Sequence, residues 1–333
     1  MRVMRVNGGR GLADLKLTEE SEPGLPTGRQ VLVRWRASSL NYHDYLVAVG
    51  GLPVEPGRIP LSDGAGEVLA VGGEVSEFGG GDRVMSSFFP EWVDGSPTER
   101  NMAIVSGETV DGFAAEQSLV NASSLTKMPV GYSFSEAATL PCAALTAWRA
   151  LVVEGGIKAG DVVLVEGTGG MSVFALQLAK LTGAKVVATT SSDEKVARLK
   201  QLGADMVINY VDEPKWGDEV YRQTGGADHV LDVGGGATMQ QSISAVKVGG
   251  SVCSIGILGG PKGTLLFPKL FFKQVRLTGL AVGSVAMQND MLRAIEACDM
   301  GPVIDKEFAL TDLAKAFEYQ ATGGHFGKIV ITI

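Results

Sequence analysis

The chain has 333 residues, 45% of them hydrophobic, and a formal net charge of −8. Its 29 Lys and Arg residues form no cluster and are outnumbered by 37 Asp and Glu, which argues against a nucleic-acid partner. No apolar run reaches the ~18 residues of a membrane span, and the first residues lack a signal-peptide core, so we expect a cytoplasmic protein without a membrane partner. Three cysteines, far apart, exclude a disulfide framework.

Residues 1 to about 125 are predicted to be rich in β-structure. Val31–Arg36 alternates apolar and charged side chains, as a half-exposed strand does. Gly64–Val71 and Arg83-Val84 are short strand-like runs bounded by glycine turns. This pattern predicts a small, strongly bent antiparallel barrel. Ser38–Gly51 is predicted to be a loop with a short helix, and Phe88–Asp94 an aromatic loop.

From about Ser135 the chain alternates helical and strand-like segments. Phe134–Val153 has a helical pattern that Pro141 interrupts. The central stretch is Asp161–Lys195: an apolar run, a glycine turn, the helical segment Met171–Leu181 and a second apolar run. Strand, turn, helix and strand within about thirty residues predict a βαβ unit with a right-handed crossover.

The glycine turn predicts a phosphate site. Such a turn at the start of a helix directs backbone N–H groups and the helix dipole toward an anion. The spacing is Gly167-x-Gly169-x-x-Ser172, with a serine where the third glycine of a dinucleotide fingerprint is usual. The candidate dinucleotide-binding residues in this turn are Gly167, Thr168, Gly169, Gly170 and Met171. The alternative is that the turn is a plain connector and that Met171 belongs to the core.

The end of the second strand bears on the choice of cofactor. An NAD site usually has an acidic residue there for the ribose 2′-hydroxyl, but this strand runs into hydroxyl side chains. Hydroxyls and cations suit a 2′-phosphate, so we favour NADPH over NADH. The candidate residues are Thr190, Ser191, Ser192, Lys195 and, beside the adenosine phosphate, Tyr210. Alternatively, Ser192 or Asp193 caps the next helix, Lys195 and Arg198 are its solvated face, and Tyr210 is structural.

Three further strands are predicted at Met206–Tyr210, Ala227–Val233 and Gly250–Ile257. Because a doubly wound sheet binds ligand at the carboxyl ends of its strands, Val233–Gly236 and Gly256 should face the nicotinamide. The last strand, Lys328–Ile333, alternates and is expected to return to the barrel.

These motifs together resemble the medium-chain dehydrogenase/reductase superfamily, in its zinc-independent, quinone-oxidoreductase-like (zinc-type alcohol dehydrogenase-like) branch. The matching stretches span nearly the whole chain: LNYHDYL at 40–46, SDGAGEVLAVG at 62–72, GGDRV at 80–84, LPCAALTAW at 140–148, GTGGMSVFALQLAK at 167–180, RLKQLGAD at 198–205, ADHVLDVGG at 227–235 and HFGKIVI at 325–331.

The resemblance implies an α/β chain of two domains. A GroES-like β-barrel catalytic domain would comprise residues 1–125 and 268–333, and a Rossmann doubly wound parallel sheet residues 126–267. It further implies an active site in the cleft between them, NAD(P)(H)-dependent reduction of quinones, enones or other carbonyls, and a homodimer paired through the Rossmann sheets.

The resemblance also predicts that there is no catalytic metal. A zinc site needs three ligands of Cys, His or carboxylate type. Aligned with the family's zinc enzymes, Asn41 takes the place of the first cysteine, and Ser62 and Asp63 replace a histidine–glutamate pair. Only Cys142 stands where a cysteine ligand would be. Residues 86–110 contain no cysteine for a structural zinc.

Without metal, hydrogen bonds must polarise the substrate. By resemblance the loop Asn41–Tyr45 lines the cleft: Asn41 or Tyr42 would contact the substrate and His43 would pass a proton. The predicted substrate contacts are Tyr45, Phe88 and Trp92, and Lys328 would reach the cofactor pyrophosphate. The alternatives are that the aromatic side chains only pack together, that the aromatic loop is a lid or a dimer contact, and that His43 is a surface histidine.

The leading hypothesis is an NADPH-dependent, metal-free oxidoreductase that transfers hydride to a quinone, enone or other activated carbonyl compound. One alternative is an NAD(P)-dependent alcohol dehydrogenase. Another, of a different class, is a cofactor-binding structural or regulatory protein, since this branch includes lens crystallins.

Overall fold

A computed structural model describes residues 1–8 and 11–333. The chain forms two compact units, Met1–Leu145 with Val282–Ile333, and Thr146–Ala281. The boundaries expected from sequence lay at 125/126 and 267/268. They differ because β7 (Leu125–Lys127) pairs with β5 in the first unit, and β13 (Arg276–Gly279) pairs with β12 in the second.

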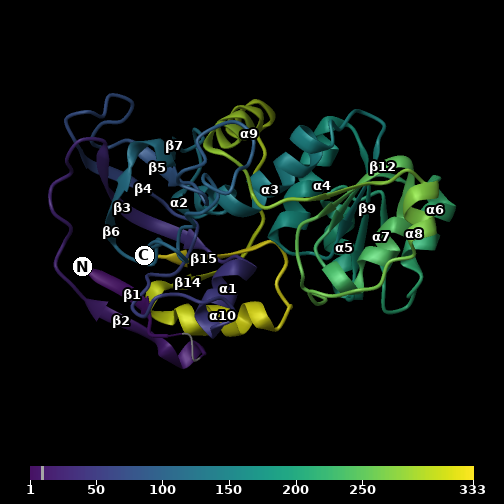
Figure 1. Ribbon diagram of the computed structural model, residues 1–333, viewed down its shortest axis with the longest axis horizontal. Helices are drawn as coiled ribbons and strands as arrows, with labels where there is room; N and C mark the ends of the chain where they lie inside the picture. The colour runs from purple at the N-terminus through teal and green to yellow at the C-terminus, as the bar shows by residue number, and fades with distance from the viewer. Residues whose placement is uncertain (9–10) are drawn as a thin grey trace. The chain divides into compact units, whose positions relative to one another are not determined.

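The first unit is built on an antiparallel sheet, as predicted (Figure 1). Its strand order is β14-β15-β3-β4-β5-β7, and β6 also pairs with β3. One pair departs from the expectation, because β14 and β15 run parallel. A separate antiparallel pair forms from the first two strands. The bounds are β1 Arg2–Val6, β2 Leu15–Glu19, β3 Gln30–Ser39, β4 Ala65–Val71, β5 Arg83–Ser86, β6 Gln117–Asn121, β14 Ile304–Ala309 and β15 Lys328–Thr332.

The long strand β3 organises this sheet. One edge pairs with β4, while the other pairs first with β6, through Gln30–Arg34, and then with β15, through Ala37–Ser39. The predicted return of the C-terminal strand is thereby confirmed. The backbone N–H of Leu40 donates to Ile329 O at 2.9 Å, so the residues after β3 lie beside the start of β15.

The first unit also contains helices α1 (Tyr42–Val49), α2 (Phe134–Ala138), α9 (Val285–Cys298) and α10 (Leu313–Ala321), and the short 3-10 helices Leu12–Asp14, Ala122–Ser124 and Leu310–Asp312. The helical stretch predicted at Phe134–Val153 is interrupted as expected at Pro141, which lies in a π-helical turn, Leu140–Ala144. Helix α3 (Leu145–Trp148) and a second π-helical turn (Arg149–Glu154) follow.

Apolar clusters of buried side chains form the core of the described part of the first unit. Trp35 packs edge-on against Phe113, with ring centroids 4.6 Å apart, inside one cluster. Phe317 of α10 belongs to another, together with residues of β1 and β15. Each such fully buried large side chain stabilises the fold by about 1.5–3 kcal/mol.

The second unit is a six-stranded parallel sheet with the order β10-β9-β8-β11-β12-β13. Its bounds are β8 Val162–Glu166, β9 Lys185–Thr190, β10 Met206–Asn209, β11 Ala227–Asp232 and β12 Val246–Ser254. The order reverses between β8 and β11, the switch point at which doubly wound folds bind ligands. The Rossmann prediction is confirmed.

Helices cover the parallel sheet, in teal and green in Figure 1. Right-handed crossovers place α4 (Gly170–Thr182) and α5 (Asp193–Gln201) on one face, and α6 (Trp216–Thr224) and α7 (Met239–Ala245) on the other. A 3-10 helix, Gly235–Ala237, precedes α7, and α8 (Phe267–Phe272) connects β12 to β13. Among the described residues, no helix is long and apolar enough to cross a membrane.

Candidate active site

The start of helix α1 carries the first group of candidate residues. Asn41 is the N-cap, and the buried carboxylate of Asp44 accepts its backbone N–H at 2.9 Å. The other oxygen of Asp44 accepts the backbone N–H of Ser62 at 2.9 Å. Asp44 therefore satisfies an orphan N–H of the helix start and joins it to the turn before β4.

Five buried side chains meet here and are called the barrel cluster: Asn41, Asp44, Ser62, Asp63 and Lys328. Lys328 Nζ donates to Leu40 O at 2.8 Å and to Asn41 Oδ1 at 2.6 Å, and it lies 3.5 Å from Asp63 Oδ2. Asn41 Nδ2 donates to Ser62 Oγ at 3.1 Å and to Asp63 Oδ2 at 2.9 Å. The amide of Asn41 is thus engaged at both ends.

The barrel cluster neutralises a buried carboxylate with a cation. Burial, with the nearby charge of Asp44, raises the pKa of Asp63, and the Lys328 ammonium and hydrogen bonds from Ser39 and Asn41 offset only part of that rise. Ser39 Oγ donates to Asp63 Oδ2 at 2.7 Å, so three donors converge on one oxygen. That is the environment of an ionised carboxylate, because donors to the charged form favour it. Asp63 Oδ1 is buried and has no hydrogen-bond partner among the residues that the structure describes.

The positions aligned with zinc ligands do not fit a metal. These positions hold the amide of Asn41, whose oxygen accepts from Lys328, the hydroxyl of Ser62 and the carboxylate of Asp63. The two further Cys or His ligands that a zinc ion requires are missing from this set. Cys142 lies half-buried in the π-helical turn. Within residues 1–8 and 11–333, no three His, Cys, Asp or Glu side chains are grouped to hold a metal ion.

His43 forms a dyad that the sequence analysis missed. Its Nε2 lies 2.8 Å from Glu108 Oε2, and its Nδ1 lies 3.5 Å from Asp44 Oδ1. Burial lowers the pKa of His43, but Asp44 and Glu108 outweigh it, so the pKa is raised overall. The imidazole ring packs edge-on against Phe88 at 5.1 Å between centroids. A histidine held by a carboxylate can keep and release a proton near neutral pH.

The predicted aromatic residues fall into two groups. Tyr42 is 40% exposed and stacks against Tyr45 with centroids 6.1 Å apart, whereas Tyr45 is half-buried and packs against the buried ring of Phe317. Phe88 and Trp92 are buried, and Trp92 Nε1 donates to Gly95 O at 3.0 Å. Trp92 therefore serves the packing of its own loop and offers no open wall to a substrate. Lys328 also differs from its predicted role, because its ammonium is 3% exposed and bound inside the barrel cluster.

In the second unit, the turn between β8 and α4 has the geometry expected of a phosphate loop. Gly167 has φ 72°, which favours glycine. A Cβ built on Gly167 or Gly169 would meet nothing within 4 Å, so the space beside the turn is open. Gly169 is the N-cap of α4 and provides no side-chain cap; the first N–H groups of the helix therefore lack an intrahelical partner.

Ser172 explains the departure from the glycine fingerprint. It is buried, and its hydroxyl donates to Glu166 O at 2.6 Å. The extra atom is therefore satisfied by the preceding strand end and lies away from the open side of the turn. Thr168 is buried, whereas Gly170 and Met171 are partly exposed at the start of α4.

The structure brings the predicted 2′-phosphate residues together at the ends of β9 and β10. Tyr210 N donates to Thr190 O at 2.9 Å, and the Tyr210 side chain is exposed. Ser192 is the N-cap of α5, but its hydroxyl makes no cap hydrogen bond. Ser191 is exposed and Lys195 lies half-buried in the first turn of α5. Thr190 thus ends β9, Ser191 and Ser192 follow it directly, and Lys195 lies in the helix that comes next.

The switch point contains two acids that the sequence analysis did not single out. Glu166 ends β8 and Asp232 ends β11. Both carboxyls are buried, and the hydroxyl of Ser242 on α7 contacts both. Burial, with the nearby charge of Asp232, raises the pKa of Glu166 to about 8. We call Glu166 and Asp232 the carboxyl pair.

The predicted glycines after β11 and β12 lie against each other. A Cβ on Gly256 would lie 2.6 Å from Val233 O, and one on Gly235 2.8 Å from Gly256 O. Only glycine permits this close approach of two backbones. Gly256 is therefore required by packing at the carboxyl edge of the sheet.

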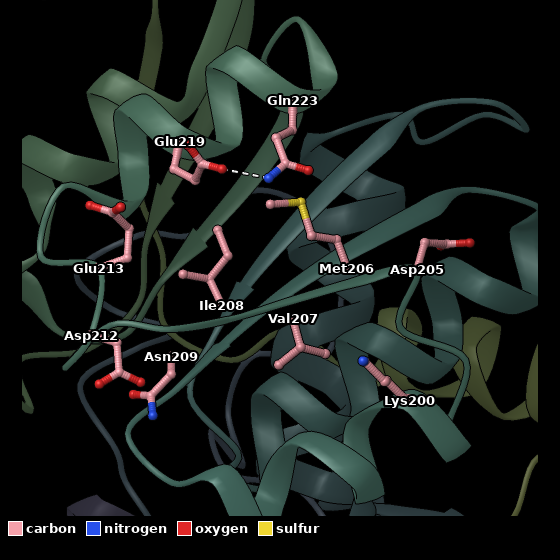
Figure 2. A pocket seen from close by; sticks show the side chains of 10 residues that line it. All are labelled: Lys200, Asp205, Met206, Val207, Ile208, Asn209, Asp212, Glu213, Glu219 and Gln223. Carbon is pink, nitrogen blue, oxygen red and sulfur yellow. Dashed lines mark hydrogen bonds between the residues drawn. The ribbon is translucent and has the colours of Figure 1, made fainter.

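An open groove of about 480 Å³ runs along the edge strand β10, and Figure 2 shows the side chains that line it. Its rim is mainly acidic, with Asp205, Asp212, Glu213 and Glu219 against Lys200. Asp205 pairs with Lys180 at 2.8 Å, and Glu219 bonds to Gln223 (Figure 2). None of the candidate cofactor residues lines this groove.

Comparisons with known proteins agree with this architecture. Residues 27–130 match the family model of the alcohol dehydrogenase GroES-like domain, and residues 170–299 that of zinc-binding dehydrogenases. A zinc-type alcohol dehydrogenase-like protein of Schizosaccharomyces pombe is 40% identical, over 97% of this chain and 96% of that protein. Quinone oxidoreductase of Pongo abelii is 28% identical, over 100% of this chain and 98% of that protein.

A solved structure has the same fold throughout. The crystal structure of an NAD-dependent alcohol dehydrogenase matches with a TM-score of 0.91 and 34% identity, covering 100% of both chains. The fold predicted from sequence, a GroES-like domain and a Rossmann sheet, is therefore confirmed. This chain belongs to the medium-chain dehydrogenase/reductase superfamily of oxidoreductases.

Proposed function

We propose that this protein is an NADPH-dependent, metal-free oxidoreductase that reduces an activated carbon–carbon double bond or a quinone. Names of related proteins support a substrate of this kind. They include the acryloyl-coenzyme A reductase of Sulfurisphaera tokodaii, 27% identical, and the 2-octenoyl-CoA carboxylase reductase CinF, solved with NADP and 2-octenoyl-CoA and 26% identical. When bound, the nicotinamide supplies a hydride for the electron-poor carbon.

The barrel cluster is the observation that carries the metal-free part of the proposal. Lys328 places an ammonium 2.6 Å from the side chain that aligns with a zinc ligand. A buried cation already compensates Asp63 there, and a second cation beside it would be repelled. Electrophilic assistance must then come from hydrogen bonds and a proton donor.

In the first unit, the dyad of His43 and Glu108 is the proton donor to the substrate. The carboxylate at 2.8 Å orients the imidazole and favours its charged form. Tyr42 is half-exposed beside it in sequence and can donate a hydrogen bond to a substrate oxygen. Asn41 acts indirectly, because its amide holds Lys328 and Ser62.

In the parallel-sheet unit, the residues fit a dinucleotide. The open glycine turn and the uncapped start of α4 suit a pyrophosphate. Ser191, Ser192 and Lys195 suit a 2′-phosphate, because hydroxyls and an ammonium both donate to phosphate oxygens. No acidic residue ends β9, where an NAD site usually has one.

Fluorescence titration of the metal-analysed protein with NADPH and NADH tests the cofactor, and a panel of enones, quinones and alcohols tests the reaction. We expect tighter binding of NADPH, no zinc, and NADPH oxidation with enones or quinones. Preference for NADH would overturn the 2′-phosphate assignment. Binding of neither nucleotide would remove the enzyme proposal.

A second candidate function is NAD(P)-dependent alcohol oxidation. It is favoured by relatives named alcohol dehydrogenase, among them one of Geobacillus stearothermophilus that is 32% identical. Reduction of NADP or NAD by primary or secondary alcohols, faster than enone reduction under matched conditions, would select this candidate over the first.

We further propose that two copies pair through the free edge of the parallel sheet. β13 is the last strand of that sheet, and exposed apolar side chains gather there and on α8: Leu266, Phe267, Phe271, Phe272 and Leu277. Contiguous apolar surface of this kind indicates a protein interface. Sedimentation should show a dimer that Phe272→Asp dissociates and the control Val130→Asp does not; a monomeric wild type would contradict this.

A further inference from the structure

The carboxyl pair lies beneath the turns that the proposed function assigns to the dinucleotide. Glu166 is followed directly by Gly167, and Asp232 by the segment Val233–Gly236. We propose that Glu166, Ser242 and Asp232 share one proton, and that this proton holds both turns in the geometry that binds the nucleotide. That the ligand is a nucleotide rests on the proposed function. The shared proton rests on the contacts of Ser242 with the two acids and does not depend on that function.

The two short contacts of Ser242 with the acids require more hydrogens than its own hydroxyl group supplies. Ser242 Oγ lies 2.6 Å from Glu166 Oε1 and 2.7 Å from Asp232 Oδ2. A hydroxyl has one hydrogen and can donate to only one of these oxygens. If both acids were ionised, the second short contact would join two acceptors. One carboxyl group must therefore carry a proton and donate it to Ser242.

The surrounding donors identify Glu166 as the protonated acid. Asp232 accepts the backbone N–H of Gly235 at 2.7 Å and the hydroxyl of Thr238 at 2.9 Å. Glu166 Oε2 receives longer contacts from the N–H groups of Val233 and Gly234, at 3.3 and 3.4 Å. Because strong donors stabilise the charged form, Asp232 is the anion. The chain then runs from Glu166 O–H to Ser242 Oγ, and from Ser242 O–H to Asp232.

Within residues 1–8 and 11–333, the side chains in register with the carboxyl pair on β9 and β12, and those hydrogen-bonded to it, are hydroxyl-bearing and not ionisable. In the sheet, Glu166 is in register with Thr189 of β9, and Asp232 with Ser254 of β12. Helix α4 contributes Ser172 to the Glu166 carbonyl, and α7 contributes Thr238, at its N-cap, and Ser242. Among the described residues, no Lys, Arg or His forms an ion pair with either acid. The shared proton is thus what compensates one of the two buried charges.

Loss of this proton would act on both turns. A second carboxylate would repel Asp232 and break the short contact to Ser242. It would also place negative charge beneath a turn that binds a pyrophosphate, where N–H groups must face the ligand. Burial and the charge of Asp232 raise the pKa of Glu166 to about 8. Nucleotide affinity should accordingly fall as the pH rises through this value.

Glu166→Gln tests the positioning role, because an amide N–H replaces the acid O–H as donor to Ser242 but cannot ionise. In the wild type we expect the dissociation constants of NADPH and NADH to rise about fivefold between about pH 7 and 9. In Glu166→Gln they should remain close to the wild-type value at about pH 7 and change little with pH. Glu219→Gln, at a partly exposed position of helix α6 in the same unit, is the matched control, and its nucleotide binding should change with pH as in the wild type.

Infrared difference spectroscopy of the apo protein tests the proton itself. At neutral pH a protonated-carboxyl C=O band should be present in the wild type and in Glu219→Gln, and absent in Glu166→Gln. If Glu166→Gln fails to fold, Ser242→Ala replaces it, and we expect a shifted band and weaker nucleotide binding at about pH 7.

The outcomes separate the two claims. Absence of the band, or wild-type nucleotide binding that does not change with pH, would overturn the shared proton while leaving the proposed function in place. Binding of neither nucleotide at any pH would overturn the proposed function and the positioning role together.

Discussion

The two compact units each bury carboxyl groups, but they compensate the charge differently. In the barrel cluster, Asp63 lies 3.5 Å from the ammonium of Lys328 and accepts further hydrogen bonds. In the parallel sheet, Glu166 and Asp232 share the hydroxyl of Ser242, and no Lys, Arg or His of the described chain forms an ion pair with them. One site is neutralised by a lysine and the other by a proton.

This difference teaches which site can respond to pH. In the barrel cluster, the ammonium of Lys328 and hydrogen bonds from Ser39 and Asn41 compensate Asp63, so this site does not depend on a proton shared between two acids. A proton on a carboxyl whose pKa is about 8 can be lost within that range. The carboxyl pair therefore provides an adjustable environment.

The largest effect should come from removing the cation of the barrel cluster. Lys328→Met leaves Asp63 buried without its counter-charge, which typically destabilises a protein by about 3–5 kcal/mol. Chemical denaturation measures the loss in the free energy of unfolding. Lys315→Met, on the exposed face of α10, is the control and should change it by less than about 0.5 kcal/mol. A loss below about 1 kcal/mol in Lys328→Met would show that the ion pair does not compensate Asp63.

The next effect concerns the pH dependence of stability. The pKa of Glu166 is raised from 4.5 to about 8, so its contribution is fully present below about pH 4.5 and is lost as the pH rises through about 8. Stability should fall in that window by up to about 1.4 kcal/mol per pH unit. Subtracting the unfolding free energies of Glu166→Gln from those of the wild type isolates this slope. Parallel pH profiles for the two proteins would argue against a protonated Glu166.

A smaller effect tests whether the parallel-sheet unit selects the nucleotide. Lys195→Ala should raise the dissociation constant of NADPH by about tenfold, because one charged hydrogen bond to phosphate is lost. The dissociation constant of NADH should stay within about twofold, since NADH has no 2′-phosphate. Equal changes for both nucleotides would remove Lys195 from the 2′-phosphate site.

The smallest effect tests the proton donor of the barrel unit. Glu108→Gln removes a carboxylate that helps to raise the pKa of His43, so the imidazolium should lose its proton at lower pH. We expect kcat at about pH 7.5 to fall about threefold, with its pH profile displaced toward acid. The nucleotide dissociation constant should not change. A change in nucleotide binding without a displaced pH profile would contradict the assignment.

Local patterns predicted much of the second unit. The apolar run, the glycine turn and the helical segment predicted within Asp161–Lys195 lie in one short stretch, and the structure confirms them as β8, the turn at Gly167 and α4. Such features depend on neighbouring residues and on glycine's freedom at positive φ. The parallel order of the strands follows from right-handed crossovers.

The charged sites depend on distant residues, and sequence patterns missed their partners. His43 and Glu108 are 65 residues apart, Glu166 and Ser242 are 76, and Lys328 and Leu40 are 288. Pairing of β15 with β3, or of β8 with β11, is needed to bring them together. One signal was available, because an acid ends each of two buried strands, at Glu166 and Asp232, where burial is unfavourable without a partner.

The measurement that tests the central claim most directly is enone reduction by one sample before and after chelation, with its zinc content determined. A protein in which Lys328 occupies the barrel cluster should contain no stoichiometric zinc and should oxidise NADPH with an enone at the same rate after chelation. Stoichiometric zinc, or activity that chelation abolishes and zinc restores, would contradict the metal-free account.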